Sequence, residues 1–163
     1  MKKKTFSFEY TLFERSDQLS KADQELLNMA RKIATESYSP YSRYHVGAAL
    51  RLEDGLVVEG SNQENVAFPS GLCAERVAAF YASANYPGIP FDTIAITAFA
   101  EDFDADQPVT PCGACRQVLS EYEHKFNRPI RVIMQGASAN ILLVESVQSL
   151  LPFTFYESKL KKL

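Results

Sequence analysis

The three cysteines of the chain stand in two short motifs that could hold a metal ion. Cys73 begins the run Cys-Ala-Glu-Arg, and Cys112 and Cys115 lie in the run Pro-Cys-Gly-Ala-Cys-Arg. Both runs lie where a helix is expected to begin, and the free N–H groups and the dipole of a helix start favour thiolate over thiol. The thiolate is the form that binds metal. Two such helix starts brought together therefore predict a three-thiolate site for one zinc ion (Zn2+) per chain.

The number of cysteines indicates which kind of metal site this is. Structural zinc sites usually have four protein ligands, whereas catalytic sites keep one position open for water. Two alternatives are a closed structural site with His45 or His124 as the fourth ligand, and a redox-active Cys-x-x-Cys pair. Neither histidine has the close spacing to a cysteine that zinc fingers show, and a redox pair leaves Cys73 and the glutamate after it unexplained. An odd cysteine count without a secretory signal also argues against a disulfide framework.

Charged side chains beside the cysteines supply the remaining parts of a catalytic site. Glu75 is the candidate general base, since a carboxylate within reach of a zinc-held water can take its proton and pass it on. In an ideal helix Cys73 and Glu75 would point about 200° apart, so both face the metal only if the first turn is irregular. Arg76 and Arg116 could donate hydrogen bonds to the thiolates and draw negative charge off the metal. Arg76 is the favoured donor, and a surface salt bridge is the alternative for both arginines.

The elements that must position these residues alternate between helix and strand. Ser20 and Asp23 form a capping-box pattern at the start of a first helix, and Asp54-Gly55 is a hairpin turn pair. Expected helices cover 20–36, 71–83 and 112–122, and expected strands cover 46–52, 56–60, 91–99, 130–134 and 141–144. This alternation predicts an α/β fold, a three-layer α/β/α sandwich with a mixed five-stranded sheet. Residues 1–163 are expected to form one domain, with residues 1–19 as an extended or irregular N-terminal extension.

Length and composition exclude several classes of protein. The chain has 163 residues, of which 46% are hydrophobic and 23% charged, a balance typical of one globular domain. A formal net charge of −3 gives no basic footprint for a nucleic acid polymer. No signal peptide is evident, and the longest apolar runs, such as 141–144, are too short to span a membrane. We therefore expect a soluble, cytoplasmic protein.

The cysteine motifs match a known pattern. Cys73-Ala74-Glu75 followed by Pro111-Cys112-Gly113-Ala114-Cys115 is the all-cysteine form of the zinc deaminase signature. More narrowly, the chain resembles the small homotetrameric cytidine deaminases from about residue 38 to 155. The similar segments also include Tyr38-Ser39-Pro40-Tyr41-Ser42, Val46-Gly47-Ala48-Ala49, Asn62-Gln63-Glu64-Asn65 and Leu150-Leu151-Pro152.

This resemblance implies a reaction and a set of partners. It implies zinc-dependent hydrolytic deamination of cytidine or deoxycytidine to uridine or deoxyuridine plus ammonia, as in pyrimidine salvage. It implies that the three cysteines bind zinc and that Glu75 moves protons. It further implies a small nucleoside substrate, a homotetramer, and no membrane or nucleic acid polymer as partner.

The resemblance also implies substrate contacts. Asn62 and Glu64 would hold the sugar, and residues two apart on a strand do point to the same side; the alternative is an exposed polar strand end. Tyr44 stands where a phenylalanine usually packs near the base, so its hydroxyl needs water or a partner. The Ala74 N–H and the Thr110 carbonyl would read the pyrimidine edge.

Two further aromatic residues are implied at a neighbouring subunit's site. Phe155 matches an aromatic that covers that site, and Phe68 sits where an aromatic faces it. Tyr156-Glu157 replaces the usual Gly-Pro after Phe155, and His45 replaces a common proline.

Three alternative functions are kept beside this interpretation. One is deamination of another aminated nucleoside or of a cytosine-containing antibiotic. Another, from a different class, is a non-catalytic zinc-binding interaction protein, which predicts four protein ligands on zinc. A polynucleotide deaminase is disfavoured by the acidic balance of the chain.

Overall fold

The computed structural model describes residues 1–104, 106–137 and 140–160. Its strands are β1 (Thr11–Phe13), β2 (Tyr44–Leu52), β3 (Val57–Ser61), β4 (Phe91–Ala100), β5 (Arg131–Gln135) and β6 (Ile141–Val144). Its longer helices are α1 (Lys21–Ala34), α2 (Ala74–Asn85) and α3 (Gly113–Phe126), and short 3-10 turns lie at Ser16–Gln18, Phe68–Ser70, Val147–Leu150 and Ser158–Leu160. The expected hairpin is confirmed, because β2 and β3 pair antiparallel around Gly55, whose φ is +88°.

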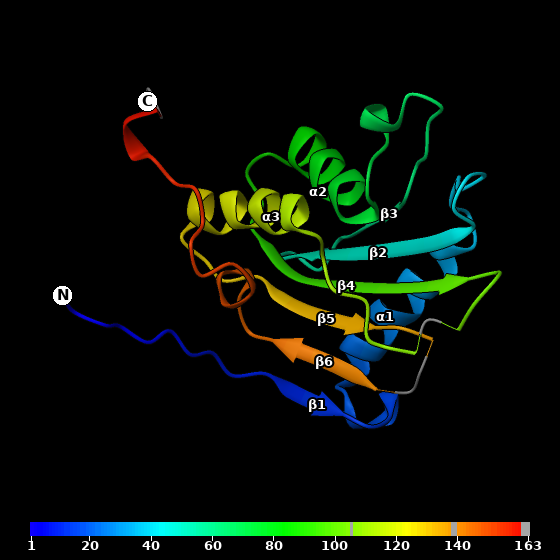
Figure 1. Ribbon diagram of the computed structural model, residues 1–163, viewed down its shortest axis with the longest axis horizontal. Helices are drawn as coiled ribbons and strands as arrows, with labels where there is room; N and C mark the ends of the chain where they lie inside the picture. Colours follow the sequence, from blue (N-terminus) through cyan, green and yellow to red (C-terminus); the bar gives the residue numbers. More distant parts are fainter. Residues whose placement is uncertain (105, 138–139, 161–163) are drawn as a thin grey trace.

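One mixed sheet lies between α1 on one face and α2 with α3 on the other, which confirms the three-layer sandwich (Figure 1). The strand order is β1-β6-β5-β4-β2-β3, with β4 and β5 parallel and all other neighbours antiparallel. The expected count of five strands is wrong, since the sheet has six. The sixth strand is β1, which pairs with β6 from Thr11↔Leu143 to Phe13↔Ile141. This pairing satisfies the free edge of β6 and lays Phe13 against the core under α1.

Two cores fill the sandwich, because successive residues of a strand point to opposite faces. Ala48 and Ile94 pack with α2 and α3, whereas their neighbours Ala49 and Ala95 pack with α1. The α1 side is further filled by Leu26, Leu27, Ala30, Ile133 and Ile141, and the other side by Ala78, Ala82, Leu119, Val132 and Met134.

Two glycines bring helix backbones directly onto the sheet. A Cβ on Gly47 would lie 2.0 Å from the carbonyl oxygen of Ala30 in α1. A Cβ on Gly60 would lie 2.6 Å from the carbonyl oxygen of Ala74, at the start of α2. Both approaches are closer than van der Waals contact permits, so only glycine fits there. The Gly60 contact sets the depth at which the first turn of α2 rests on β3.

A buried carboxylate ties α1 to the sheet. The side chain of Asp23 is 5% exposed and accepts hydrogen bonds from Arg51 at 3.1 Å and from Arg131 at 3.1 Å. The backbone N–H of Asp23 donates to the Ser20 hydroxyl at 3.2 Å, which confirms the expected helix cap. Burial alone would raise the pKa of Asp23, but the hydrogen bonds from Arg131, Ser20 and Arg51 outweigh it, so the pKa is lowered.

We expect Asp23→Asn to lower the free energy of unfolding at pH 7 by about 2 kcal/mol. A carboxyl whose pKa is lower in the folded state stabilises fully above its unfolded value of about 3.9. That stabilisation is lost as the pH falls through the folded value, so the difference between wild type and variant should shrink at about pH 3. Urea unfolding at both pH values measures it, with the exposed Asp17→Asn as the control. An equal loss at both pH values would contradict the assignment.

Within the described ranges, none of the helices combines the length and the apolar character that crossing a bilayer requires.

Candidate functional site

The three cysteines lie together at the starts of α2 and α3. Cys73 and Cys112 are the N-cap residues of these helices, and Cys115 lies buried in the first turn of α3. Their sulfur atoms lie within 4.8 Å of one another, with Cys73 to Cys112 at 3.9 Å and Cys112 to Cys115 at 3.5 Å. A tetrahedral zinc ion with Zn–S bonds of about 2.3 Å separates its sulfurs by about 3.8 Å. The donor set and its spacing therefore fit zinc.

Hydrogen bonding within the cluster prepares it for a metal. The bond with Cys115 lowers the pKa of Cys73 to about 5 against the effect of burial, and Arg76 contributes further. The same bond and burial raise the pKa of Cys115. Cys73 is therefore the sulfur that most readily becomes a thiolate, the form that binds metal.

The backbone before α2 resolves the conflict between Cys73 and Glu75. Cys73 has φ −72° and ψ 152°, an extended conformation, and the helix begins only at Ala74. Helical periodicity therefore does not separate the two side chains, and both line one cavity. The expected start of this helix at residue 71 is three residues too early.

The environment of Glu75 suits proton transfer. Glu75 is 4% exposed, and burial raises the pKa of its carboxyl, with a further contribution from the Cys73 thiolate. A buried carboxyl that lines the same cavity as two of the metal ligands is placed to accept a proton and to return it.

The two arginines beside the ligands have different partners. The Arg76 guanidinium donates from Nη2 to the Cys73 sulfur at 3.5 Å. Arg116 instead donates to the carbonyl oxygens of Pro111 at 2.7 Å and Leu150 at 2.9 Å. Within the described part of the chain, Arg116 therefore makes neither the thiolate contact nor the salt bridge considered for it. It fixes the loop before α3 against the segment near residue 150.

We expect Arg76→Gln to weaken zinc affinity by about 10- to 100-fold, because it removes the charged hydrogen bond to the Cys73 sulfur. Competition with a chelator of known affinity measures the loss. Arg128→Gln, which removes an exposed ion pair with Glu53, is the matched control. Equal zinc affinity in the two variants would contradict a role for Arg76 at the metal.

A cavity of about 840 Å³ opens in front of the sulfurs. Cys73, Cys112 and Glu75 form one end of it, and Tyr44, Asn62 and Glu64 line it further out. Small-molecule sites commonly enclose about 300–1,000 Å³. The cavity therefore has room for a nucleoside next to the metal ligands.

The residues expected at the sugar lie past the end of a strand. β3 ends at Ser61, so Asn62 and Glu64 do not share a strand face, contrary to expectation. Asn62 clamps β2 instead: its Oδ1 accepts from the Val46 N–H at 2.7 Å and its Nδ2 donates to the Tyr44 carbonyl at 2.9 Å. These bonds fix the wall that carries Tyr44.

Two backbone groups that sequence reasoning missed hold Glu64. Its Oε2 accepts from the N–H groups of Tyr41 at 2.8 Å and Ser42 at 3.2 Å. The bond from the Ser42 side chain, followed by these backbone bonds, lowers the pKa of Glu64, so the carboxylate is ionised at neutral pH. The Tyr38–Ser42 motif was the available signal, but its pairing with Glu64 depends on the tertiary fold.

The remaining expected contact residues separate into two groups. Thr110 and Phe68 line the cavity of their own chain. The Phe68 ring packs edge-on against the Tyr41 ring, with the ring centroids 5.7 Å apart. Ala74 is fully buried at the start of α2. Phe155 is 71% exposed and lies outside the cavity lining, with its backbone hydrogen-bonded to Gln117 at 2.9 and 3.1 Å.

Neither histidine joins the cluster, which in the described ranges consists of the three cysteines alone. His45 Nδ1 lies 2.7 Å from the Ser37 hydroxyl, and its Nε2 lies 3.0 Å from Glu101. His124 stacks on Tyr156. The closed structural zinc site therefore lacks its fourth ligand in this part of the chain.

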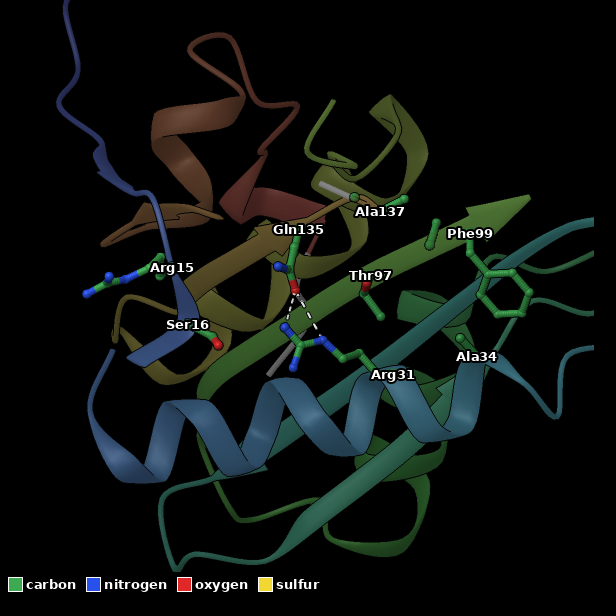
Figure 2. Close-up of a pocket in the computed structure, with 10 residues that line it drawn as sticks. Arg15, Ser16, Arg31, Ala34, Thr97, Phe99, Gln135 and Ala137 are labelled. Atoms are coloured by element: carbon green, nitrogen blue, oxygen red, sulfur yellow. Dashed lines mark hydrogen bonds between the residues drawn. The ribbon is translucent and has the colours of Figure 1, made fainter. Parts of the chain in front are cut away.

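A second cavity, of about 500 Å³, lies on the other face of the sheet, between α1 and the ends of β4 and β5 (Figure 2). Its described lining contains neither a thiol nor a carboxylate. Arg31 there points at Gln135, whose Oε1 accepts from it at 2.5 Å, and also donates to Asn28 at 2.5 Å. Of these two cavities, the first alone has thiols and carboxylates in its described lining.

Comparison with known proteins identifies the group to which this site belongs. Residues 20–127 match the family model described as the cytidine and deoxycytidylate deaminase zinc-binding region. The chain belongs to this deaminase family. It is therefore an enzyme whose family description names zinc, and the matched range contains all three cysteines and Glu75.

Individual cytidine deaminases are similar to this chain in sequence and in structure. A cytidine deaminase of Halalkalibacterium halodurans is 45% identical over 98 residues, which span 60% of this chain and 70% of the relative. One of Sporosarcina psychrophila is 42% identical over 100 residues, spanning 61% and 68%. The solved cytidine deaminase of Burkholderia pseudomallei superimposes with a TM-score of 0.69 at 35% identity, covering 80% of this chain and 97% of that one.

Proposed function

We propose that this deaminase hydrolyses cytidine and deoxycytidine to uridine or deoxyuridine and ammonia. The observation that carries the proposal is the buried Glu75 carboxyl beside three sulfur ligands in a cavity of nucleoside size. Membership of the deaminase family supports the same reaction. A cytoplasmic role in pyrimidine salvage is the physiological setting that we propose.

The chain's own residues divide the work of this reaction. Cys73, Cys112 and Cys115 would hold the zinc ion, which when bound polarises water and lowers its pKa. Glu75 takes one proton from the attacking water and gives it to the ring nitrogen. It then takes the second proton, from the hydroxyl now on the ring carbon, and gives it to the amine, which leaves as ammonia when the carbon–nitrogen bond breaks. Arg76 withdraws charge from the Cys73 sulfur.

The nucleoside would be held by the outer part of the cavity. We assign the ribose hydroxyls to Asn62 and Glu64, and the face of the base to Tyr44. The Ala74 N–H and the Thr110 carbonyl would read the pyrimidine edge. The position of Tyr44, Asn62, Glu64 and Thr110 in one lining supports this assignment.

The proposed assembly is a homotetramer in which Phe155 and Phe68 complete a neighbouring site. The high exposure of both rings, 71% and 75%, supports contacts to a further subunit. Each subunit would be one domain, since β1 of the N-terminal extension joins the same sheet as the strands of the matched region.

Substrate comparison tests the proposal. Because Glu64 is ionised, a phosphate near the sugar is repelled, so we expect kcat/KM for cytidine to exceed that for cytidine monophosphate by more than about tenfold. Release of ammonia from cytidine, deoxycytidine, the monophosphate and a cytosine-containing antibiotic is followed with zinc-loaded protein. Faster turnover of the monophosphate or the antibiotic than of cytidine would overturn the assignment.

A further inference from the structure

Residues 43–45, which span the start of β2, contact three consecutive residues after the end of β4. The Arg43 guanidinium lies 3.3 Å from the Asp102 carboxylate, and His45 lies 3.0 Å from Glu101. Between these pairs, the rings of Tyr44 and Phe103 stack nearly parallel, with centroids 6.1 Å apart and planes 9° apart. The Glu101 N–H also donates to the Arg43 carbonyl at 3.2 Å. Each residue of the Glu101–Phe103 segment thus contacts one of residues 43–45.

The backbone of Tyr44 is fixed independently of its ring. Its N–H donates to the Ser42 hydroxyl at 3.1 Å, and its carbonyl accepts from Asn62 at 2.9 Å. Arg43 before it adopts φ +51°, a left-handed turn that a non-glycine residue takes only when its surroundings hold it there. The Cα–Cβ direction of Tyr44 is therefore set, and its side-chain torsions decide where the ring lies.

The ring itself has few other restraints. Among the described residues, Tyr44 makes its hydrogen bonds through its backbone, and its hydroxyl makes none. One aromatic ring, Phe103, stacks on it there. Tyr44 lines the nucleoside cavity, whereas Phe103 is 57% exposed and lies outside that lining. Phe103 therefore supports the ring from outside the cavity.

We propose that Phe103 is a positioning residue, which holds the Tyr44 ring in the orientation that packs against the nucleoside. The inference rests on the proposed function, because it assigns to Phe103 a part in binding the same substrate. Tyr44 touches the ligand, and Phe103 acts only through it. Phe103 does not line the cavity that holds the zinc ligands and Glu75, so Phe103→Ala should change substrate affinity more than proton transfer.

Truncation of Phe103 tests this proposal. Aromatic pairs of this kind correspond to about a 2- to 10-fold change in an equilibrium constant, so Phe103→Ala should raise KM for cytidine and Kd for uridine by about that factor. We expect kcat to stay within about twofold, since the machinery of proton transfer is untouched. Phe103→Tyr keeps the ring and should restore both constants. Phe6→Ala, at an aromatic that is 54% exposed and does not line this cavity, is the matched control.

Combination with changes at Tyr44 separates positioning from a general structural effect. In a Tyr44→Leu background, Phe103→Ala should cause no further loss of uridine affinity, whereas in a Tyr44→Phe background the full effect should remain. Unchanged uridine affinity in Phe103→Ala, or an equal loss in the Tyr44→Leu background, would overturn the proposal. Failure of the proposed function shows separately, as a wild-type protein that does not turn over cytidine.

Discussion

Glu75→Gln should reduce kcat for cytidine by about 100- to 10,000-fold while one zinc ion per chain stays bound. Glutamine keeps the size of the side chain but cannot accept a proton from water or return one to the base. The raised pKa of Glu75, which follows from burial and from the neighbouring Cys73 thiolate, is lost with the carboxyl. Turnover is measured as uridine formed by purified protein, with zinc content determined on the same sample.

The matched control for this variant is Glu59→Gln, an exposed glutamate on β3. It makes the same chemical change outside the cavity and should leave turnover and zinc content as in wild type. Near-normal turnover in Glu75→Gln would contradict the proton-transfer role of Glu75.

Cys115→Ser should remove zinc and turnover together. Cys115 is fully buried in the first turn of α3, and serine there stays protonated and binds zinc poorly. Changes to groups around a zinc site already cost about 10- to 100-fold in affinity, so loss of a ligand should cost at least about 100-fold. Zinc content after dialysis against a weak chelator, followed by cytidine turnover, measures both effects.

A chelation cycle supplies the control for this second variant. Wild-type protein stripped of metal should regain turnover when zinc is added back, whereas Cys115→Ser should not at the same zinc concentration. Circular dichroism of both proteins checks that the helices remain. A Cys115→Ser protein that keeps zinc and turnover would mean that the three sulfurs are not the metal site.

Local patterns predicted most of the fold. Short apolar runs predicted five of the six strands, and Asp54-Gly55 predicted the β2–β3 hairpin. β1 was not predicted, because it is only three residues long. It forms by pairing with the free edge of β6, which lies over a hundred residues later in the chain. A strand that exists to cover a distant edge leaves little signal in its own residues.

The candidate site shows the same division between local and distant causes. The spacing of the cysteines and Glu75 within two motifs was enough to predict one metal centre. The true start of α2 was not predicted, because an extended N-cap at Cys73 depends on how α2 rests on Gly60. The partners of Arg116 were missed for a similar reason, since Leu150 lies 34 positions away in the chain.

The source of the oxygen atom that replaces the amine in uridine is the measurement that tests the central claim most directly. Zinc-loaded protein is incubated with cytidine in water enriched in the heavy oxygen isotope, and the uridine and ammonia formed are analysed by mass spectrometry. Hydrolytic deamination predicts one solvent oxygen in each uridine and one ammonia for each uridine formed. Uridine without solvent oxygen, or no conversion of cytidine by protein that holds one zinc per chain, would contradict the account.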